Sequence, residues 1–202
     1  YTNSDLVYND DGYIEVDKNG NVAVKDDYMD DIYLGSVFPK YNLAWRNDFN
    51  YKGINLGVLF TARIGGICYS ATQANMDLYG VSEASAAARD AGGVMINGRD
   101  MIDAQKWYQV IGSQSGLPQY YTYSATNVRL QELSLGYTLP SKWFRDKMRM
   151  TVSFVGRNLW MIYCKAPFDP EAVASTGLNY QGIDYFMMPS MRSLGFNVKF
   201  QF

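Results

Sequence analysis

Apolar side chains recur at every second position in five parts of the chain, which is the period of a β-strand and not of a helix. The segments are 41–49, 54–63, 127–139, 148–160 and 192–202. The last segment is the most regular, because apolar residues from Leu194 to Phe202 alternate with small or polar ones. The pattern predicts five strands, each with one apolar face.

Two details predict how these strands connect and bend. Segments 41–49 and 54–63 are separated by a four-residue connection, which favours a hairpin. In 127–139 the first apolar residues are out of phase with the later ones. A β-bulge near Gln131-Glu132 would restore a single apolar face.

The connections between the strands alternate in length. Those at 50–53 and 140–147 are short, whereas 1–40, 64–126 and 161–191 are long. Strands of about ten residues with short turns at one end and long loops at the other are typical of an outer-membrane β-barrel. We therefore predict an all-β fold, an antiparallel transmembrane β-barrel segment located in the cell outer membrane. A soluble β-sandwich that binds carbohydrate, with one solvated face on each strand, remains the alternative.

Five strands are too few to close a barrel, because the smallest membrane barrels have about eight. Aromatic residues gather near the predicted strand ends, where the aromatic girdles of barrels lie. The chain ends on Phe202, directly on the last predicted strand. We expect the chain to be the C-terminal piece of a larger barrel.

Composition excludes several functions. The 18 Lys and Arg against 20 Asp and Glu give a net charge of −2, and no basic cluster indicates nucleic-acid binding. The chain has no His, and Cys68 and Cys164 are too far apart in sequence to form a metal-ligand motif. We expect no catalytic residues, no metal ligands and no enzyme activity. The two cysteines fall in long loops, where either a disulfide or two thiols is compatible with the sequence.

The first part of the chain is strongly acidic. Residues 1–31 carry nine acids and two lysines, a charge of −7. Turn signals at Asp11-Gly12 and Asn19-Gly20 predict an exposed polar arm with a small hairpin, formed by 13–16 and 21–24. We assign 1–40 to an acidic extracellular loop and 41–202 to the barrel strands, with long loops at 64–126 and 161–191.

Several motifs together resemble the C-terminal part of the SusC/RagA family of TonB-dependent outer-membrane transporters. They are VRLQELSLGYTLP at 128–140, GRNLW at 156–160, FDPE at 168–171, LGSVFPK at 34–40, FNYKG at 49–53 followed by Gly65-Gly66, and the final strand 194–202. The resemblance covers nearly the whole chain. It implies the last strands of a 22-stranded barrel that imports oligosaccharides or peptides, with a SusD-like surface lipoprotein as lid. TonB would be contacted by an N-terminal part that this sequence does not contain.

Family members often carry a calcium-like Asp/Asn-Gly loop in the acidic arm. Residues 9–12 and 17–21 fit that pattern only in part, since neither gives the full loop with its distal Glu. We expect a solvated turn there and no cofactor, and calcium binding in the acidic arm remains the alternative.

The resemblance also gives roles to the final strand and to the polar strand faces. Phe200 and Phe202 are similar to the terminal signal that the barrel-assembly machinery recognises on an open strand edge. Ionic residues on the polar faces would line the lumen or touch the plug domain; they are Arg46, Asp48, Arg63, Arg157 and Lys199. The lipid-facing set would be Leu43, Trp45, Ile54, Leu56, Val58, Phe60, Met150, Val152, Phe154, Phe196 and Val198.

The long loop 64–126 has its own features. Its composition at 82–90 and 100–109 predicts short helices. Five aromatic residues are candidates for contact with substrate or partner: Trp107, Tyr108, Tyr120, Tyr121 and Tyr123. Aromatic rings stack on sugars and peptide side chains, and tyrosine adds a hydroxyl. Packing of these rings within the loop or against the lid lipoprotein remains the alternative.

Overall fold

The computed structural model describes residues 4–26, 32–113, 116–145, 147–172, 174, 177 and 180–201. The chain divides into two compact units, which are described separately. The loop unit comprises 1–36, 68–123 and 173–187, and the sheet unit comprises 37–67, 124–172 and 188–202. No helix among the described residues has the length and apolarity to cross a membrane.

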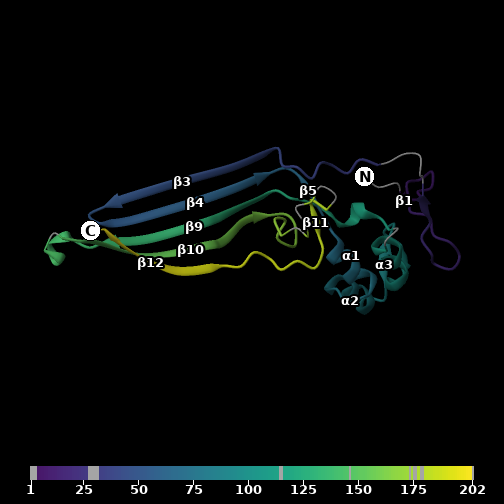
Figure 1. Ribbon diagram of the computed structural model, residues 1–202. Coiled ribbons are helices and arrows are strands. Elements are labelled where there is room, and N and C mark those ends of the chain that lie inside the picture. The colour runs from purple at the N-terminus through teal and green to yellow at the C-terminus, as the bar shows by residue number, and fades with distance from the viewer. Residues whose placement is uncertain are drawn as a thin grey trace. The chain divides into compact units, whose positions relative to one another are not determined.

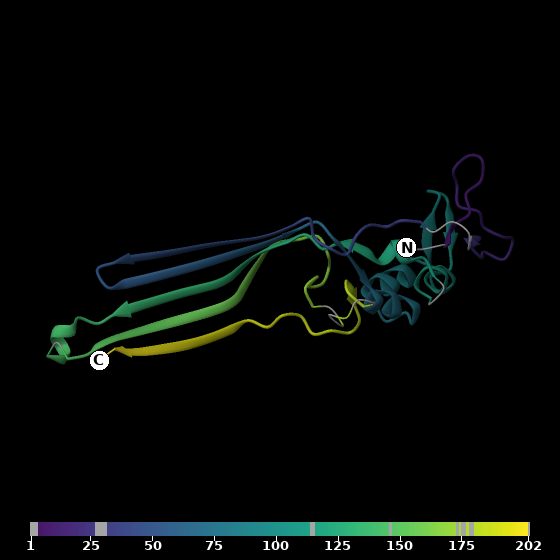
Figure 2. The same ribbon diagram turned by 45° about the horizontal axis from the view of Figure 1, so that its top comes forward.

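The sheet unit is built on one antiparallel sheet. Its strands are β3 (Tyr41–Tyr51), β4 (Ile54–Ile64), β9 (Asn127–Thr138), β10 (Arg149–Cys164) and β12 (Ser193–Gln201). The order is β12-β10-β9-β4-β3, and Figures 1 and 2 show the five strands side by side. The five strands predicted from the alternating pattern are confirmed. Each strand has one apolar face, and pairing in the observed register keeps these faces on the same side of the sheet.

The hairpin between β3 and β4 has a two-residue turn. Lys52 and Gly53 both have positive φ, at 48° and 87°, as the primed turns of hairpins require. A Cβ atom at Gly53 would lie 2.8 Å from the Thr138 carbonyl oxygen, so the neighbouring strand end also requires glycine there. The predicted hairpin is therefore confirmed, with a turn two residues shorter than the connection expected.

A bulge keeps β9 in phase. Leu59 of β4 pairs with Glu132 and Phe60 pairs with Leu130, which leaves Gln131 as the extra residue. The bulge expected at this place is confirmed. The pairing between β9 and β10 also shifts register next to the bulge, between Arg157 and Trp160 of β10. Asn158, inside this interval, has a positive φ of 55°. Both halves of β9 consequently present their apolar side chains on one face.

Three helices belong to the loop unit: α1 (Ala71–Leu78), α2 (Glu83–Asp90) and α3 (Ala104–Gly112), as drawn in Figure 1. Its short strands are β1 (Ser4–Leu6), β2 (Val24–Asp26), β5 (Ile67–Ser70), β6 (Val94–Ile96), β7 (Asp100–Ile102), β8 (Thr122–Ser124) and β11 (Ile183–Asp184), of which β5 and β8 extend to the sheet unit. Short 3-10 helices lie at Pro118–Tyr121 and Ser141–Phe144.

The helices agree with the predictions in part. The helix expected at 82–90 is confirmed, and the one expected at 100–109 begins only at Ala104 because Asp100–Ile102 pairs with β6. Helix α1 was not predicted. It begins where the Ser70 hydroxyl accepts a hydrogen bond from the Gln73 amide, a cap that satisfies one of the free N–H groups of the first turn.

The acidic arm contributes to the core of the loop unit. The buried core residues are Leu6, Val22, Ala74, Ile96, Ile102, Trp107, Ile111, Leu117 and Tyr121. Leu6 and Val22 are 3% and 7% exposed. The expectation of an entirely exposed polar arm is therefore wrong, because burial of these apolar side chains outweighs the polarity of their neighbours. Of the small hairpin expected in the arm, a single bridge between Val16 and Val22 forms.

The backbone hydrogen bonds of the arm follow an eight-residue repeat that the sequence analysis missed. The Val7 amide donates to the Ala23 carbonyl, the Ala23 amide to Glu15 and the Glu15 amide to Val7, with N to O distances of 2.9–3.0 Å. Side-chain oxygens of Asn9 and Asp17 cap the two turns, each accepting hydrogen bonds from the amides two and four residues later. A segment with few apolar residues is thereby ordered by local hydrogen bonds.

Candidate functional site

The two faces of the five-stranded sheet differ in polarity. One cross-strand row consists of Phe49, Leu56, Leu135, Phe154 and Phe196. The strand period and register place all eleven residues assigned to the lipid-facing set on this face. Its side chains are uncovered; Phe196, for example, is 80% exposed. Exposed apolar patches of this extent are typical of surfaces that contact a membrane or another protein.

Charged side chains form a row across the opposite face. The Arg46 Nε lies 2.9 Å from an Asp48 carboxylate oxygen, and the Arg157 Nε lies 3.1 Å from Glu132. Glu132, on β9 between the strands of these two arginines and next to β10, is also 3.9 Å from an Arg46 nitrogen. The structure thus joins three of the predicted ionic residues through Glu132. Sequence analysis missed Glu132 because the bulge interrupts the alternation next to it.

The other two predicted ionic residues lie apart from this row. Lys199 pairs in register with Thr151 on the same polar face. The Arg63 Nη2 donates to the Val37 carbonyl at 3.1 Å, and its buried Nε has no hydrogen-bond partner within the described residues.

A buried arginine, Arg129, forms the most heavily bonded site in the sheet unit. Its side chain is only 3% exposed, and its Nη2 lies 2.8 Å from Asp169 and 3.3 Å from Glu171. Its Nε and Nη1 each lie 3.3 Å from side-chain oxygens of Asn127 and Asn158. A buried guanidinium needs such partners, since leaving it unpaired is costly.

Asp169 extends the network to a further segment. It accepts hydrogen bonds from the Glu171 amide and from the amide and hydroxyl of Ser190. Burial alone would raise the pKa of Asp169, but the bonds from Arg129 and Ser190 outweigh it and the pKa lies below its usual value.

The network joins three sequence motifs that are separate along the chain. Arg129 lies in the motif at 128–140, Asn158 in the one at 156–160, and Asp169 and Glu171 in the one at 168–171. This arrangement fixes the last long loop against β9 and β10.

The five aromatic candidates have different environments. Trp107 and Tyr121 are buried in the core of the loop unit at 8% and 3% exposure. Tyr120 is 39% exposed and meets Trp107 edge to face, with ring centroids 6.0 Å apart. Burial, with the nearby Tyr8 and Asp5, raises the pKa of Tyr120 to about 12. Tyr108 and Tyr123 are half-buried. Burial of Trp107 and Tyr121 favours the packing interpretation for these two, and Tyr120 keeps the largest surface for contact.

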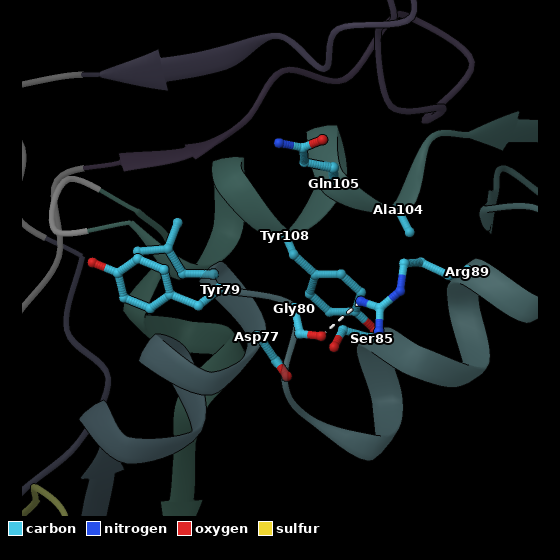
Figure 3. A pocket seen from close by; sticks show the side chains of 9 residues that line it. Asp77, Tyr79, Gly80, Ser85, Arg89, Ala104, Gln105 and Tyr108 are labelled. Carbon is cyan, nitrogen blue, oxygen red and sulfur yellow. Dashed lines mark hydrogen bonds between the residues drawn. The ribbon is translucent and has the colours of Figure 1, made fainter.

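A small pocket lies between the three helices of the loop unit (Figure 3). Its volume is about 190 Å³. The polar side chains on its wall are Asp77, Tyr79, Ser85, Arg89, Gln105 and Tyr108. Arg89 donates a 2.7 Å hydrogen bond to the Gly80 carbonyl, the dashed line in Figure 3. Sequence analysis found no signal for this pocket, because its residues come from three separate helices.

Metal-binding groups do not come together in the part of the chain that the structure describes. No cluster of three or more Cys, Asp or Glu side chains has metal-binding geometry there. Asp17 accepts bonds from the Asn19 and Asn21 amides and the Asn21 side chain, which lower its pKa. Its carboxylate oxygens are thus already used within the turn. Cys68 and Cys164 are both thiols.

Comparison with known proteins finds one curated relative. TonB-dependent receptor P3 of Formosa agariphila is 25% identical over 198 residues, an alignment that covers 93% of this chain and 19% of the relative. The chain thus spans about a fifth of that protein's length. No family model matches the chain.

Solved structures with the same fold include those of a peptide transporter, RagAB. The closed-closed state matches with a TM-score of 0.58 at 18% identity, covering 93% of this chain and 20% of that one. A second RagAB structure matches with a TM-score of 0.60 at 17% identity, covering 96% and 22%. The predicted resemblance to SusC/RagA-type TonB-dependent transporters and the predicted fold class are confirmed: the chain has the fold of a segment of these proteins.

Proposed function

We propose, from the premise that this chain resembles a TonB-dependent receptor in sequence and RagAB in fold, that it is part of an outer-membrane transporter for bulky nutrients. The nutrients would be oligosaccharides or peptides, taken up with a SusD-like surface lipoprotein and with energy coupling through TonB. The observation that carries the proposal is the sheet with one continuous exposed apolar face and an ionic row on the other face.

The two faces suit the two environments of a barrel wall. The exposed apolar face, with Trp45 at 58% and Phe196 at 80% exposure, is suited to lipid. The ionic row around Glu132 requires water or a protein partner, which the lumen and plug domain of a transporter supply. Lys199 and Arg63 would line the same interior.

The alternative of a soluble carbohydrate-binding sandwich is not favoured. A sandwich buries the apolar face of each sheet against a second sheet. In the sheet unit, the described long strands form a single sheet whose apolar face is uncovered.

The final strand has a proposed role in assembly. Phe200 pairs with Met150 at the end of β12, and Phe202 lies outside the described residues. We propose that both belong to the signal recognised during barrel assembly, since an unpaired strand edge is available for strand addition until the barrel closes.

Import is tested in cells that lack the full-length gene and in the same cells complemented with it. Fluorescent peptides and fluorescent oligosaccharides of similar size are supplied separately, and uptake of one class should fall in the deletion strain and return on complementation. Deletion of a neighbouring gene for a SusD-like lipoprotein should lower the same uptake. Unchanged uptake of both classes in both strains would contradict the proposal.

A further inference from the structure

Asp77 is a buried carboxylate without a charged partner. The residue is 5% exposed, and within the described residues no Lys or Arg forms an ion pair with it. It accepts a hydrogen bond from the Gln73 side-chain amide at 2.9 Å, within the same helix. Burying a charge is unfavourable unless a partner compensates it.

The position of Asp77 in α1 adds to this cost. It lies in the last turn of the helix, which contains no basic residue. The C-terminal end of a helix carries a partial negative charge, so a carboxylate there is repelled. A buried carboxylate without a charged partner that also borders a pocket is a candidate for a binding role.

The surroundings of Asp77 include a buried tyrosine hydroxyl. The Tyr121 hydroxyl is buried and lies close enough to Asp77 to interact with its side chain, although it makes no hydrogen bond of normal geometry within the described residues. Burial raises the pKa of Tyr108 and Tyr121, and the charge of Asp77 raises both further. Tyr108 and Tyr121 therefore stay neutral and supply no positive charge next to Asp77.

Opposite charges face the same pocket from two helices. Asp77 of α1 and Arg89 of α2 are both on its wall, together with the Tyr108 ring of α3, as Figure 3 shows. Arg89 is held by its bond to the Gly80 carbonyl, and a Cβ atom at Gly80 would lie 2.8 Å from the Arg89 Nη1. The pocket thus offers an acceptor for a cation and, at a distinct place, a donor for an oxygen atom. Its volume is that of about six water molecules, enough for one small group.

We propose that this pocket binds the ammonium group and adjacent carbonyl oxygen of an α-amino compound, with Asp77 accepting from the ammonium and Arg89 donating to the oxygen. A peptide N-terminus and a free amino acid share this chemistry. The proposal rests on the proposed function only where it connects this ligand with import; binding itself does not require transport.

The test uses the purified full-length protein in detergent and saturation-transfer NMR, which detects weak binding. The probes are alaninamide, which represents a peptide N-terminus, free alanine, N-acetylalaninamide and butylamine. Alaninamide should bind at least ten times more tightly than its acetylated form, which has no ammonium group. Tighter binding of alanine than of alaninamide would identify the free amino acid as the ligand. Equal binding of alaninamide and its acetylated form would overturn the proposal without any variant.

Substitutions of Asp77 and Arg89 then test whether each charge binds the part of the ligand proposed for it. Asp77→Asn keeps an acceptor for Gln73 and should weaken alaninamide binding at least tenfold, whereas Asp90→Asn, an exposed control at the end of α2, should leave it unchanged. Arg89→Gln should weaken alaninamide but not butylamine. Asp77→Asn should also melt at the same temperature as the unmodified protein or higher. A large fall in its melting temperature with unchanged binding would show that Asp77 is structural and would overturn the proposal.

Discussion

Arg129 and Arg157 lie on neighbouring strands and both bind carboxylates, yet their surroundings differ. The Arg129 side chain is 3% exposed and contacts two acids, whereas that of Arg157 is 67% exposed and contacts one. Water screens an exposed pair and competes for its hydrogen bonds, so such pairs contribute little to stability. A buried pair that loses one member leaves an uncompensated charge.

Replacing Arg129 by Met should therefore destabilise the protein by roughly 3–5 kcal/mol, because Asp169 remains buried without its partner. Arg157→Met, the matched control, should have no measurable effect. The measurement is the heat or urea concentration at which the full-length barrel loses its compact electrophoretic mobility. Equal effects of the two substitutions would contradict the role assigned to the buried network.

The network also predicts a pH dependence. Because the pKa of Asp169 is lower in the folded protein than in the unfolded chain, its contribution to stability is present above the unfolded value of about 3.9 and is lost as the pH falls through the folded value. The stability difference between the unmodified protein and Asp169→Asn should be constant from pH 5 to 8 and shrink below about pH 4. A difference that does not change down to pH 2 would show that the charge of Asp169 is not what stabilises the loop.

At the scale of elements, successive residues of each long strand point to opposite faces of the sheet, one apolar and one polar. Val152 of β10 belongs to the apolar cross-strand row with Tyr137 and Val198. Its neighbour Thr151 points to the other face, where its hydroxyl lies 3.0 Å from that of Thr138. Adjacent residues of one strand should therefore differ sharply in their tolerance of charge.

Val152→Arg should impair assembly in the outer membrane, because an arginine facing hydrocarbon near the midplane costs roughly 2–4 kcal/mol. Thr151→Arg, one residue away on the polar face, should assemble normally. Immunoblots of outer-membrane fractions provide the measurement. If both variants reach normal levels, the apolar face does not meet lipid and the proposed membrane location fails.

At the scale of the whole molecule, the antiparallel order of the strands decides which connections share a side of the membrane. The turn at Lys52-Gly53 and the connection 140–147 lie at the same ends of their strands, and 64–126 and 161–191 follow the opposite ends. We expect the short turns to face the periplasm, and both long loops would then be extracellular.

A protease site inserted at Gly92-Gly93, after α2, should therefore be cleaved on intact cells. Both glycines have positive φ, and a Cβ atom at Gly92 would meet no atom within 4 Å, so an insertion there has room. The same site inserted after Lys142 should be protected until the outer membrane is broken. Protection of the first site and cleavage of the second would reverse the topology.

The sequence alone determined the five long strands, the bulge at Gln131 and the division of side chains between two faces. These features follow from the alternation of apolar and polar residues within about ten positions, and pairing between such strands leaves few registers that keep one face apolar. The family resemblance followed from motifs that the same strands carry.

Tertiary structure alone decided which distant residues meet. Two of the partners of Arg129, Asn158 and Asp169, lie 29 and 40 positions away. Leu6 and Val22 of a polar arm join a core with α3, and the Asp77 pocket is assembled from three short helices. The local alternation of apolar and polar residues does not predict such contacts, because each contact depends on how long loops fold onto the rest of the chain. The strand pattern specifies faces, whereas burial and charge compensation across the loops specify the sites.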